Sequence, residues 1–135
     1  MKIFIAHKVA GEDLNKLKVV MEGIAKALEK AGHGYYCTFI DETNNPKKFK
    51  GWKTEDFMFD ALKILDNSDA ILVYVNSFER AEGPLIESGY ALAKKKKIIL
   101  AVNRNIPTAF LRGISTKVIE FDDITDLCKQ LEAFK

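Results

Sequence analysis

The chain has 135 residues, of which 47% are hydrophobic and 30% charged, a balance that predicts one soluble globular domain over residues 1–135 and excludes a disordered chain. Its 21 basic and 19 acidic side chains leave a net charge of +2, too small for a dedicated nucleic-acid-binding protein. Two cysteines, Cys37 and Cys128, are too few for a disulfide framework and indicate a reducing, cytoplasmic compartment. The cysteines and histidines also lack zinc-ligand spacing, and no apolar run is long enough for a membrane span.

The first half of the chain alternates between strand-like and helix-like patterns. Residues 2–6 form a short β-prone run, and residues 12–31 follow with apolar side chains at helical spacing. Residues 35–40, rich in aromatic and β-branched side chains, predict a second strand. Residues 41–53 are polar and contain proline and glycine, which predicts a loop. A second helix is expected to begin at Thr54.

The second half continues the same alternation. Its apolar runs are typical of strands buried in a parallel sheet, and Pro84 is suited to the first turn of a helix. We expect strands at 70–75, 98–102 and 117–121, and helices at 83–95, 107–113 and 123–134.

This alternation predicts the fold class. Strands separated by helices form a parallel sheet with helices on both faces, because each crossover connection is long and right-handed. The sequence therefore predicts an α/β, flavodoxin-like three-layer sandwich with a five-stranded parallel sheet. Ligands of such a sheet bind at the carboxyl ends of the strands.

The strand ends argue against three common site types. A dinucleotide-binding turn after the first strand needs several glycines, and only Gly11 is present. The glycine-rich loop of nucleoside-triphosphate-binding proteins is absent. A phospho-receiver needs acidic side chains at the ends of strands one and three, where the chain has His7, Lys8, Asn76 and Ser77.

The third predicted helix carries the candidate catalytic group. Glu87 lies early in this helix, where the helix dipole favours an ionised carboxylate. An ionised, positioned carboxylate is what attack on an anomeric carbon requires. Gly89 leaves space beside it, and Tyr90 is placed to orient it or a substrate. The alternative is an exposed glutamate that only complements the helix dipole.

This segment resembles a known family. The string Glu87, Gly89, Tyr90 and Ala91, together with the strand entry at residues 68–70, resembles the hallmark of the nucleoside 2-deoxyribosyltransferase-like superfamily. The resemblance extends over residues 2–121. It implies that Glu87 is the nucleophile that attacks C1′ and releases the base. The family includes transferases acting on nucleosides and hydrolases acting on 2′-deoxynucleoside 5′-monophosphates.

Two further site residues of the family, one an acid and the other Asp or Ser in many relatives, do not align directly with this chain. One lies eight residues before the aspartate of the strand entry, a spacing that meets Ala61, with Asp60 one residue away. The resemblance therefore implies Asp60 as the group that holds the sugar or shuttles a proton, with a solvated helix aspartate as the alternative. The other lies six residues before the nucleophile, where the chain has Ala81 followed by Glu82. This departure bears on protonation of the leaving base and on phosphate binding.

The resemblance also implies a homodimer. Residues 108–113 resemble the segment from which the monophosphate hydrolases send a hydroxyl into the neighbouring subunit's phosphate site, and Thr108 keeps that hydroxyl. Arg112 in the same segment suits either a phosphate or a surface ion pair.

Other candidate substrate contacts come from loops at the strand ends. His7, Lys8 and Gly11 follow the first strand; a helix start with a nearby lysine is an anion site, which favours a phosphorylated substrate. His7 is alternatively a packed residue. In the loop 46–53, Trp52 is a candidate for stacking on a nucleobase, although a nucleic-acid patch or a solvated basic loop anchored by Trp52 fits the same pattern. Ser77 and Gly83 complete the predicted contacts.

The main hypothesis is therefore an enzyme that cleaves the N-glycosidic bond of a (2′-deoxy)nucleoside or its 5′-monophosphate with Glu87 as nucleophile. It is a hydrolase if water resolves the intermediate and a deoxyribosyltransferase if a second base does. It needs no cofactor or metal, and neither a nucleic-acid polymer nor a membrane is an expected partner. The alternatives are a non-catalytic nucleotide-binding module and an NAD glycohydrolase.

Overall fold

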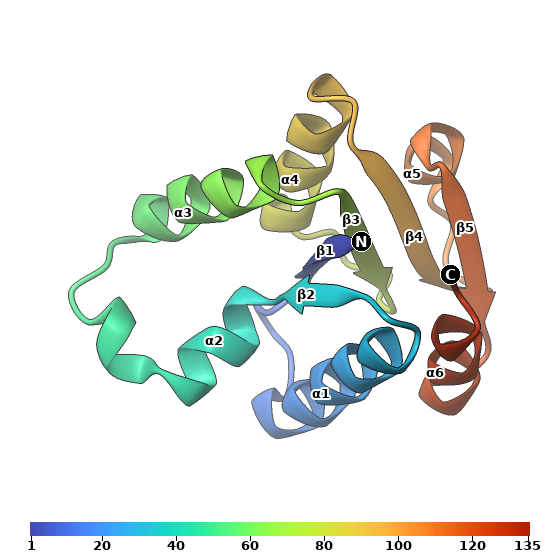
Figure 1. Cartoon of the computed structure of the whole chain (residues 1–135), viewed down its shortest axis with the longest axis horizontal. Helices are drawn as coiled ribbons and strands as arrows, with labels where there is room; N and C mark the ends of the chain where they lie inside the picture. The colour runs from blue at the N-terminus through green and yellow to red at the C-terminus, as the bar shows by residue number, and fades with distance from the viewer.

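The computed structural model describes all 135 residues and contains one sheet of five parallel strands (Figure 1). The spatial order of the strands is β2-β1-β3-β4-β5, so the chain reverses its direction of travel across the sheet between β1 and β3. The flavodoxin-like α/β sandwich expected from the sequence is confirmed. The strands are β1 (Lys2–His7), β2 (Gly34–Tyr36), β3 (Ala70–Val75), β4 (Lys97–Asn103) and β5 (Lys117–Phe121).

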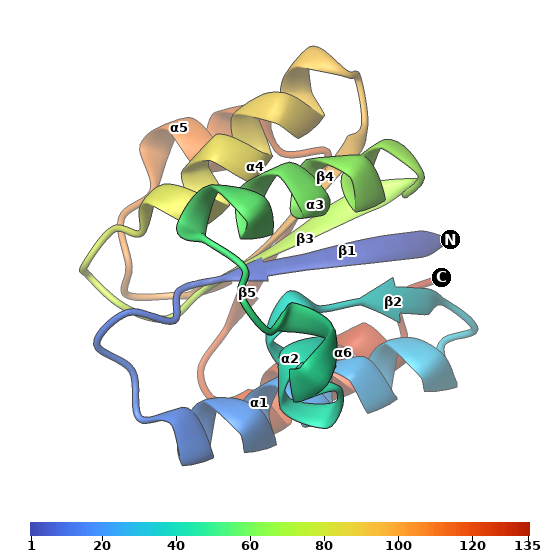
Figure 2. The ribbon, with the colours of Figure 1, turned by 90° about the vertical axis from the view of Figure 1, so that its left-hand side faces the viewer.

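Helices cover both faces of the sheet. Figure 2 shows α3, α4 and α5 on one face and α1 and α6 on the other. None of the helices combines the length and the apolar character that a membrane span requires. The helices are α1 (Leu14–Lys30), α2 (Thr38–Asn44), α3 (Thr54–Asp66), α4 (Glu82–Ala93), α5 (Ala109–Ile114) and α6 (Ile124–Glu132), with a short 3₁₀ helix at Pro46–Phe49.

Each face of the sheet has its own hydrophobic core. Met21, Ile24 and Leu28 recur at helical spacing on α1 and are fully buried against one face, where α6 adds Leu127. On the other face Ala61, Leu65 and their neighbours on α3 pack with α4 and α5. Because β3 is covered on both sides, residues 70–73 are all buried, which explains their continuous apolar run.

The predicted strand at residues 35–40 is wrong in its second half. Strand β2 ends at Tyr36, and the chain turns into α2 at Thr38, in a region where a polar loop was expected to follow residue 40. Contacts of α2 account for the turn: Phe39 packs edge-on against His7 with ring centroids 5.8 Å apart, and Asp41 accepts a 2.6 Å hydrogen bond from the Tyr36 hydroxyl. Tertiary packing thus outweighs the local β propensity.

The short β2 leaves part of β1 uncovered. Its register with β1 ends where Phe4 meets Tyr36, whereas β1 and β3 stay paired to the level of His7. Residues 5–7 therefore have a strand neighbour on one side only. The space on the other side lies between α2, α3 and the start of α4, at the carboxyl edge of the sheet where this architecture binds ligands.

Candidate active site

Two hollows lie at the carboxyl edge of the sheet. The larger, here called the Glu87 cleft, has a volume of about 580 Å³ and is lined by the end of β1, by α2 and α3, and by the first two turns of α4. The smaller, here called the Lys8 pocket, has a volume of about 60 Å³ and lies between Lys8, the segment after β3, Thr108 and Leu111. Small-molecule sites usually measure about 300–1,000 Å³, so only the Glu87 cleft has the size to hold a nucleoside.

Glu87 is the central group of the cleft. Its side chain comes from the second turn of α4, is only 9% exposed, and makes no hydrogen bond or ion pair. Burial alone raises the pKa of the carboxyl from 4.5 to about 7. The expectation that the helix dipole favours an ionised Glu87 is therefore corrected. The dipole acts most strongly in the first turn, Glu87 lies beyond that turn, and desolvation prevails.

His7 lies in the same cleft but has both ring nitrogens occupied. Its Nδ1 lies 3.1 Å from the carbonyl oxygen of Lys8 and its Nε2 lies 3.5 Å from the thiol of Cys37. A carbonyl can only accept, so Nδ1 carries the hydrogen and Nε2 accepts from the thiol. Burial lowers the pKa of His7 and raises the pKa of Cys37 to about 11, which keeps both groups neutral. This is the arrangement of a packed, hydrogen-bonded histidine.

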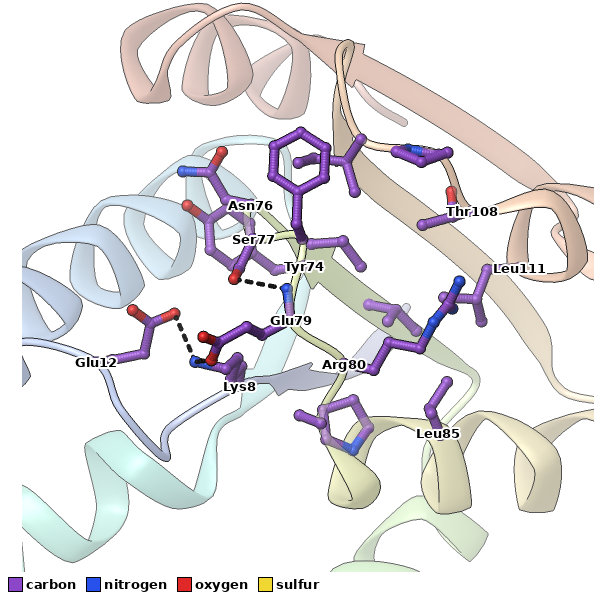
Figure 3. Close-up of a pocket in the computed structure, with 17 residues that line it drawn as sticks. Lys8, Glu12, Tyr74, Asn76, Ser77, Glu79, Arg80, Leu85, Thr108 and Leu111 are labelled. Atoms are coloured by element: carbon purple, nitrogen blue, oxygen red, sulfur yellow. Dashed lines mark hydrogen bonds and ion pairs between the residues drawn. The ribbon is translucent and has the colours of Figure 1, made fainter.

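Lys8 faces the other hollow. The Lys8 ammonium donates a 2.6 Å hydrogen bond to the carbonyl of Ala10. It also lies 3.9 Å from the Glu12 carboxylate and 3.4 Å from the Glu79 carboxylate, the two ion pairs that Figure 3 shows. A Cβ at Gly11 would lie 3.4 Å from this ammonium. The cation thus already has partners outside the Glu87 cleft.

Ser77 and Thr108 also line the Lys8 pocket. The Ser77 hydroxyl accepts a hydrogen bond from the backbone N–H of Glu79. The Thr108 hydroxyl is buried and has no hydrogen-bond partner in the chain. The structure therefore brings Lys8, Ser77 and Thr108 together, but apart from Glu87.

Three other predicted site residues lie outside the cleft lining. The Tyr90 hydroxyl donates to Asp66 at 2.7 Å, not to Glu87. Trp52 packs against Phe49 and Phe57, with ring centroids 4.7 Å and 5.3 Å away. Asp60 is half-buried, and it is the next residue, Ala61, that lines the cleft, because consecutive helical residues point about 100° apart.

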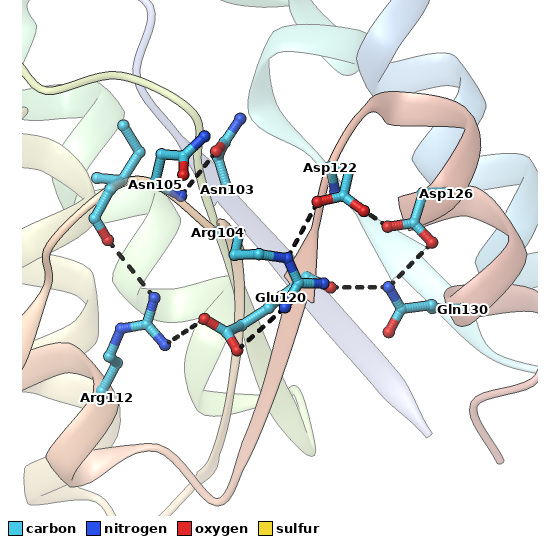
Figure 4. A network of polar contacts seen from close by, with 9 residues as sticks. Asn103, Arg104, Asn105, Arg112, Glu120, Asp122, Asp126 and Gln130 are labelled. Carbon is cyan, nitrogen blue, oxygen red and sulfur yellow. Dashed lines mark hydrogen bonds and ion pairs between the residues drawn. The ribbon is translucent and has the colours of Figure 1, made fainter.

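Arg112 forms the surface ion pair rather than facing either hollow. It lies 3.0 Å from the Glu120 carboxylate and also contacts the carbonyl of Ile106. Figure 4 shows Arg104 on the other side of the same glutamate, where it also binds Asp122 at 3.0 Å.

Sequence reasoning missed two acidic residues of the cleft. Glu42 of α2 and Glu55 of α3 line it together with Glu82, Gly83 and Glu87 of α4. Neither had a motif to mark it, although Glu55 in the first turn of a helix after a polar loop was a usable signal. No three His, Cys, Asp or Glu side chains converge where they could share a metal ion.

Comparison with solved structures identifies similar folds. A CMP N-glycosidase from Clostridium botulinum superposes with a TM-score of 0.70 and 18% identity, covering 99% of this chain and 100% of that one. A 2-deoxyribosyltransferase from Bacillus psychrosaccharolyticus gives a TM-score of 0.70 and 18% identity, covering 100% of this chain and 93% of its own. A conserved protein from Enterococcus faecalis gives 0.68 with 13% identity, covering 98% of this chain and 97% of its own.

Sequence comparison adds nothing to this: no protein-family model matches the chain, and no curated protein does. The similarity is one of fold, extends over the whole chain, and agrees with the resemblance inferred from the Glu87 segment. This chain shares its fold with the CMP N-glycosidase and the 2-deoxyribosyltransferase.

Proposed function

We propose that this protein is an enzyme that cleaves the N-glycosidic bond of (2′-deoxy)nucleosides or their 5′-monophosphates, with Glu87 as the nucleophile. The observation that carries the proposal is the Glu87 carboxyl itself, which is buried and unpartnered in a cleft large enough for a nucleoside. Two proteins of similar fold are an N-glycosidase and a deoxyribosyltransferase, and this supports cleavage of an N-glycosidic bond.

The proposed reaction has two steps. A carboxylate oxygen of Glu87 attacks C1′, the bond from C1′ to the base nitrogen breaks, and its electron pair leaves with the base. The sugar is then held as an ester of Glu87. Water resolves the ester in a hydrolase, and a second base does so in a transferase. The chemistry uses no cofactor.

Burial of Glu87 serves this reaction. A carboxylate without hydrogen-bond donors or cations around it is poorly stabilised and is therefore a stronger nucleophile than one in an ion pair. With a pKa of about 7, the carboxyl is half ionised at neutral pH. Rates limited by attack on C1′ should therefore rise with pH up to this value and then level off.

The test is the release of free base from nucleosides and 5′-monophosphates, followed by chromatography. Glu87→Gln keeps the shape of the side chain and removes the nucleophile, so the rate should fall by at least about a thousandfold. Glu29→Gln, an exposed position on α1, is the matched control and should keep full activity. Base release that survives Glu87→Gln would refute the assignment. Adding a second base separates transferase from hydrolase, because only a transferase forms the new nucleoside.

A non-catalytic nucleotide-binding module is the second candidate. It is favoured by the positions of Asp60 and Tyr90, since neither lies beside Glu87 to hold the sugar or orient the carboxyl. Calorimetric binding of a nucleotide with no base released over hours would support it. The predicted homodimer is tested separately, by sedimentation of the purified chain.

A further inference from the structure

We propose that the substrate of the Glu87 cleft is a nucleoside whose base carries a positive charge, such as an N-alkylated purine or a pyridinium, and whose sugar carries no phosphate. This inference rests on the proposed function and specifies its substrate class. It is argued from the charges of the cleft, from its lack of a free imidazole, and from the positions of the neighbouring cations.

The walls of the cleft are acidic. Glu42, Glu55 and Glu82 come from α2, α3 and α4, and all three are exposed carboxylates that surround the buried Glu87. No lysine or arginine lines the cleft. Clefts lined by one sign of charge concentrate ligands of the opposite sign and repel ligands of the same sign. A cation is therefore attracted, and a phosphate dianion is repelled.

Aromatic rings add to this preference. Phe39 of α2 and Phe57 of α3 both line the cleft. The faces of aromatic rings attract cations, and a flat cationic base also gains contact area by stacking on them.

The first turns of α2, α3 and α4 line this cleft. Because helix N-termini carry a partial positive charge and bind anions, they are the strongest argument for an anionic rather than a cationic substrate. The partial positive charge at α3 and α4 is already offset, because α3 has Glu55 and Asp56, and α4 has Glu82, in the first turn. The first turn of α2 also has an acid, Asp41, which is paired with Lys48. Pro84 also removes one backbone N–H from the start of α4. These helix starts therefore do not form a phosphate site.

The cations close to the cleft in the fold do not line it, and two of them, Lys8 and Lys48, are held by carboxylates. Lys8 faces the Lys8 pocket between Glu12 and Glu79, and Arg80 lines that same pocket. Lys48 forms a 2.6 Å ion pair with Asp41, and neither residue lines the cleft. Lys53 adjoins Thr54 at the start of α3 but does not line the cleft.

The cleft also lacks a free imidazole to protonate the leaving base, and its other acidic side chains are the glutamates already named. A neutral base departs as an anion unless a general acid gives it a proton. His7 has no proton to give, since Nδ1 donates to a backbone carbonyl and Nε2 accepts from Cys37. A cationic base needs no proton: when the bond from C1′ to its nitrogen breaks, the electron pair neutralises the cation and the base leaves uncharged.

The experiment compares 7-methylguanosine with guanosine, which differ by one methyl group and one positive charge, in ribose and 2′-deoxyribose forms. The measured quantity is the ratio of kcat/KM for the cationic over the neutral nucleoside. Methylation weakens the glycosidic bond by itself, so the decisive comparison is between proteins. The ratio in the native chain is divided by the ratio in Glu42→Gln/Glu55→Gln/Glu82→Gln. The intrinsic lability of the methylated nucleoside then cancels, because both proteins act on the same two compounds.

We expect the triple variant to lower this ratio by at least about tenfold, mainly through a higher KM for the cation. The triple variant Glu22→Gln/Glu29→Gln/Glu132→Gln makes the same charge change on α1 and α6 and should leave the ratio unchanged. Nicotinamide riboside should behave like 7-methylguanosine, and nicotinamide mononucleotide should be cleaved at least about tenfold less well than the riboside. If the triple substitution impairs folding, the three single variants give the same readout with smaller changes.

An unchanged ratio in the cleft variant, or a mononucleotide cleaved as well as the riboside, would overturn the inference and leave glycosidic cleavage intact. If the native chain cleaves none of these compounds, calorimetry decides the inference, and the proposed function is judged by the general base-release test. Tighter binding of the cationic nucleoside that depends on the three glutamates supports it, and equal or absent binding overturns it.

Discussion

The Glu87 cleft and the Lys8 pocket are neighbours that share Pro84, yet their charged groups are arranged in opposite ways. In the Lys8 pocket the ammonium has a carbonyl and two carboxylates within 4 Å. In the cleft the Glu87 carboxyl has no partner at all. A paired charge adds a little stability, whereas a buried unpaired charge costs stability and is kept where chemistry needs it. The comparison therefore supports the proposal that the cleft is the reactive region.

The largest expected effect comes from removing the Glu87 charge, and it is on the free energy of unfolding. The rise of its pKa from 4.5 to about 7 corresponds to roughly 3 kcal/mol of unfolding free energy. The folded chain holds this proton more tightly than the unfolded chain, so stability is full below pH 4.5 and falls as the pH rises through 7. Glu87→Gln should be more stable than the native chain by roughly 3 kcal/mol at pH 8 and equal to it at pH 4, measured by urea unfolding.

Glu29→Gln serves as the control for this measurement and should follow the pH dependence of the native chain. Parallel stability curves for the native chain and Glu87→Gln would show that the carboxyl is not desolvated. The argument for an activated nucleophile would then lose its physical basis.

A smaller effect is expected in the Lys8 pocket, at Thr108. Its buried hydroxyl has no partner, so Thr108→Val should raise the unfolding free energy by about 1 kcal/mol. Thr116 is the matched control, because its hydroxyl accepts a hydrogen bond from the Ile98 N–H, and Thr116→Val should be destabilising. If the Thr108 hydroxyl instead reaches a neighbouring subunit, as the resemblance implies, Thr108→Val should weaken self-association in sedimentation.

The smallest effect is expected at Lys8. Lys8→Gln removes two ion pairs at the edge of the solvent, and such pairs contribute little, so the unfolding free energy should fall by at most about 1 kcal/mol. Lys18→Gln, which removes an exposed pair with Glu22, should change it still less. If Lys8→Gln lowered the unfolding free energy by much more than about 1 kcal/mol, the charge most important for stability would lie in the Lys8 pocket rather than in the cleft.

The fold was predictable because its signals are local. The continuous apolar run at 70–75 coincides with β3, since a strand covered on both faces needs apolar side chains along its length. The run at 117–121 coincides with β5, an edge strand that is buried only at Ile119 and Phe121. The α1 helix was visible in its apolar spacing, and Asp13 caps it by accepting from the N–H groups of Asn15 and Lys16.

The site was only partly predictable. Glu87 and Gly83 were placed in the correct helix by their sequence context, and the structure puts both in the cleft. The family spacing falls on Ala61, and Asp60 is the nearest acidic residue to it. In the structure Ala61 lines the cleft and Asp60 does not. Tyr90 was expected near Glu87, and its hydroxyl instead binds Asp66, which lies 24 positions away in the sequence.

By itself, the sequence determined the order of strands and helices, the sheet type and the one carboxyl on which the proposed function depends, because each follows from apolar periodicity or a contiguous motif. Only the tertiary structure decided where β2 stops, and hence that β1 borders a cleft. The tertiary structure also places the consecutive residues His7 and Lys8 in different sites, His7 in the Glu87 cleft and Lys8 in the Lys8 pocket. Side chains alternate in direction along an extended chain, so neighbours in sequence face opposite ways. The pKa of Glu87 was likewise beyond the sequence, because burial by distant segments sets it.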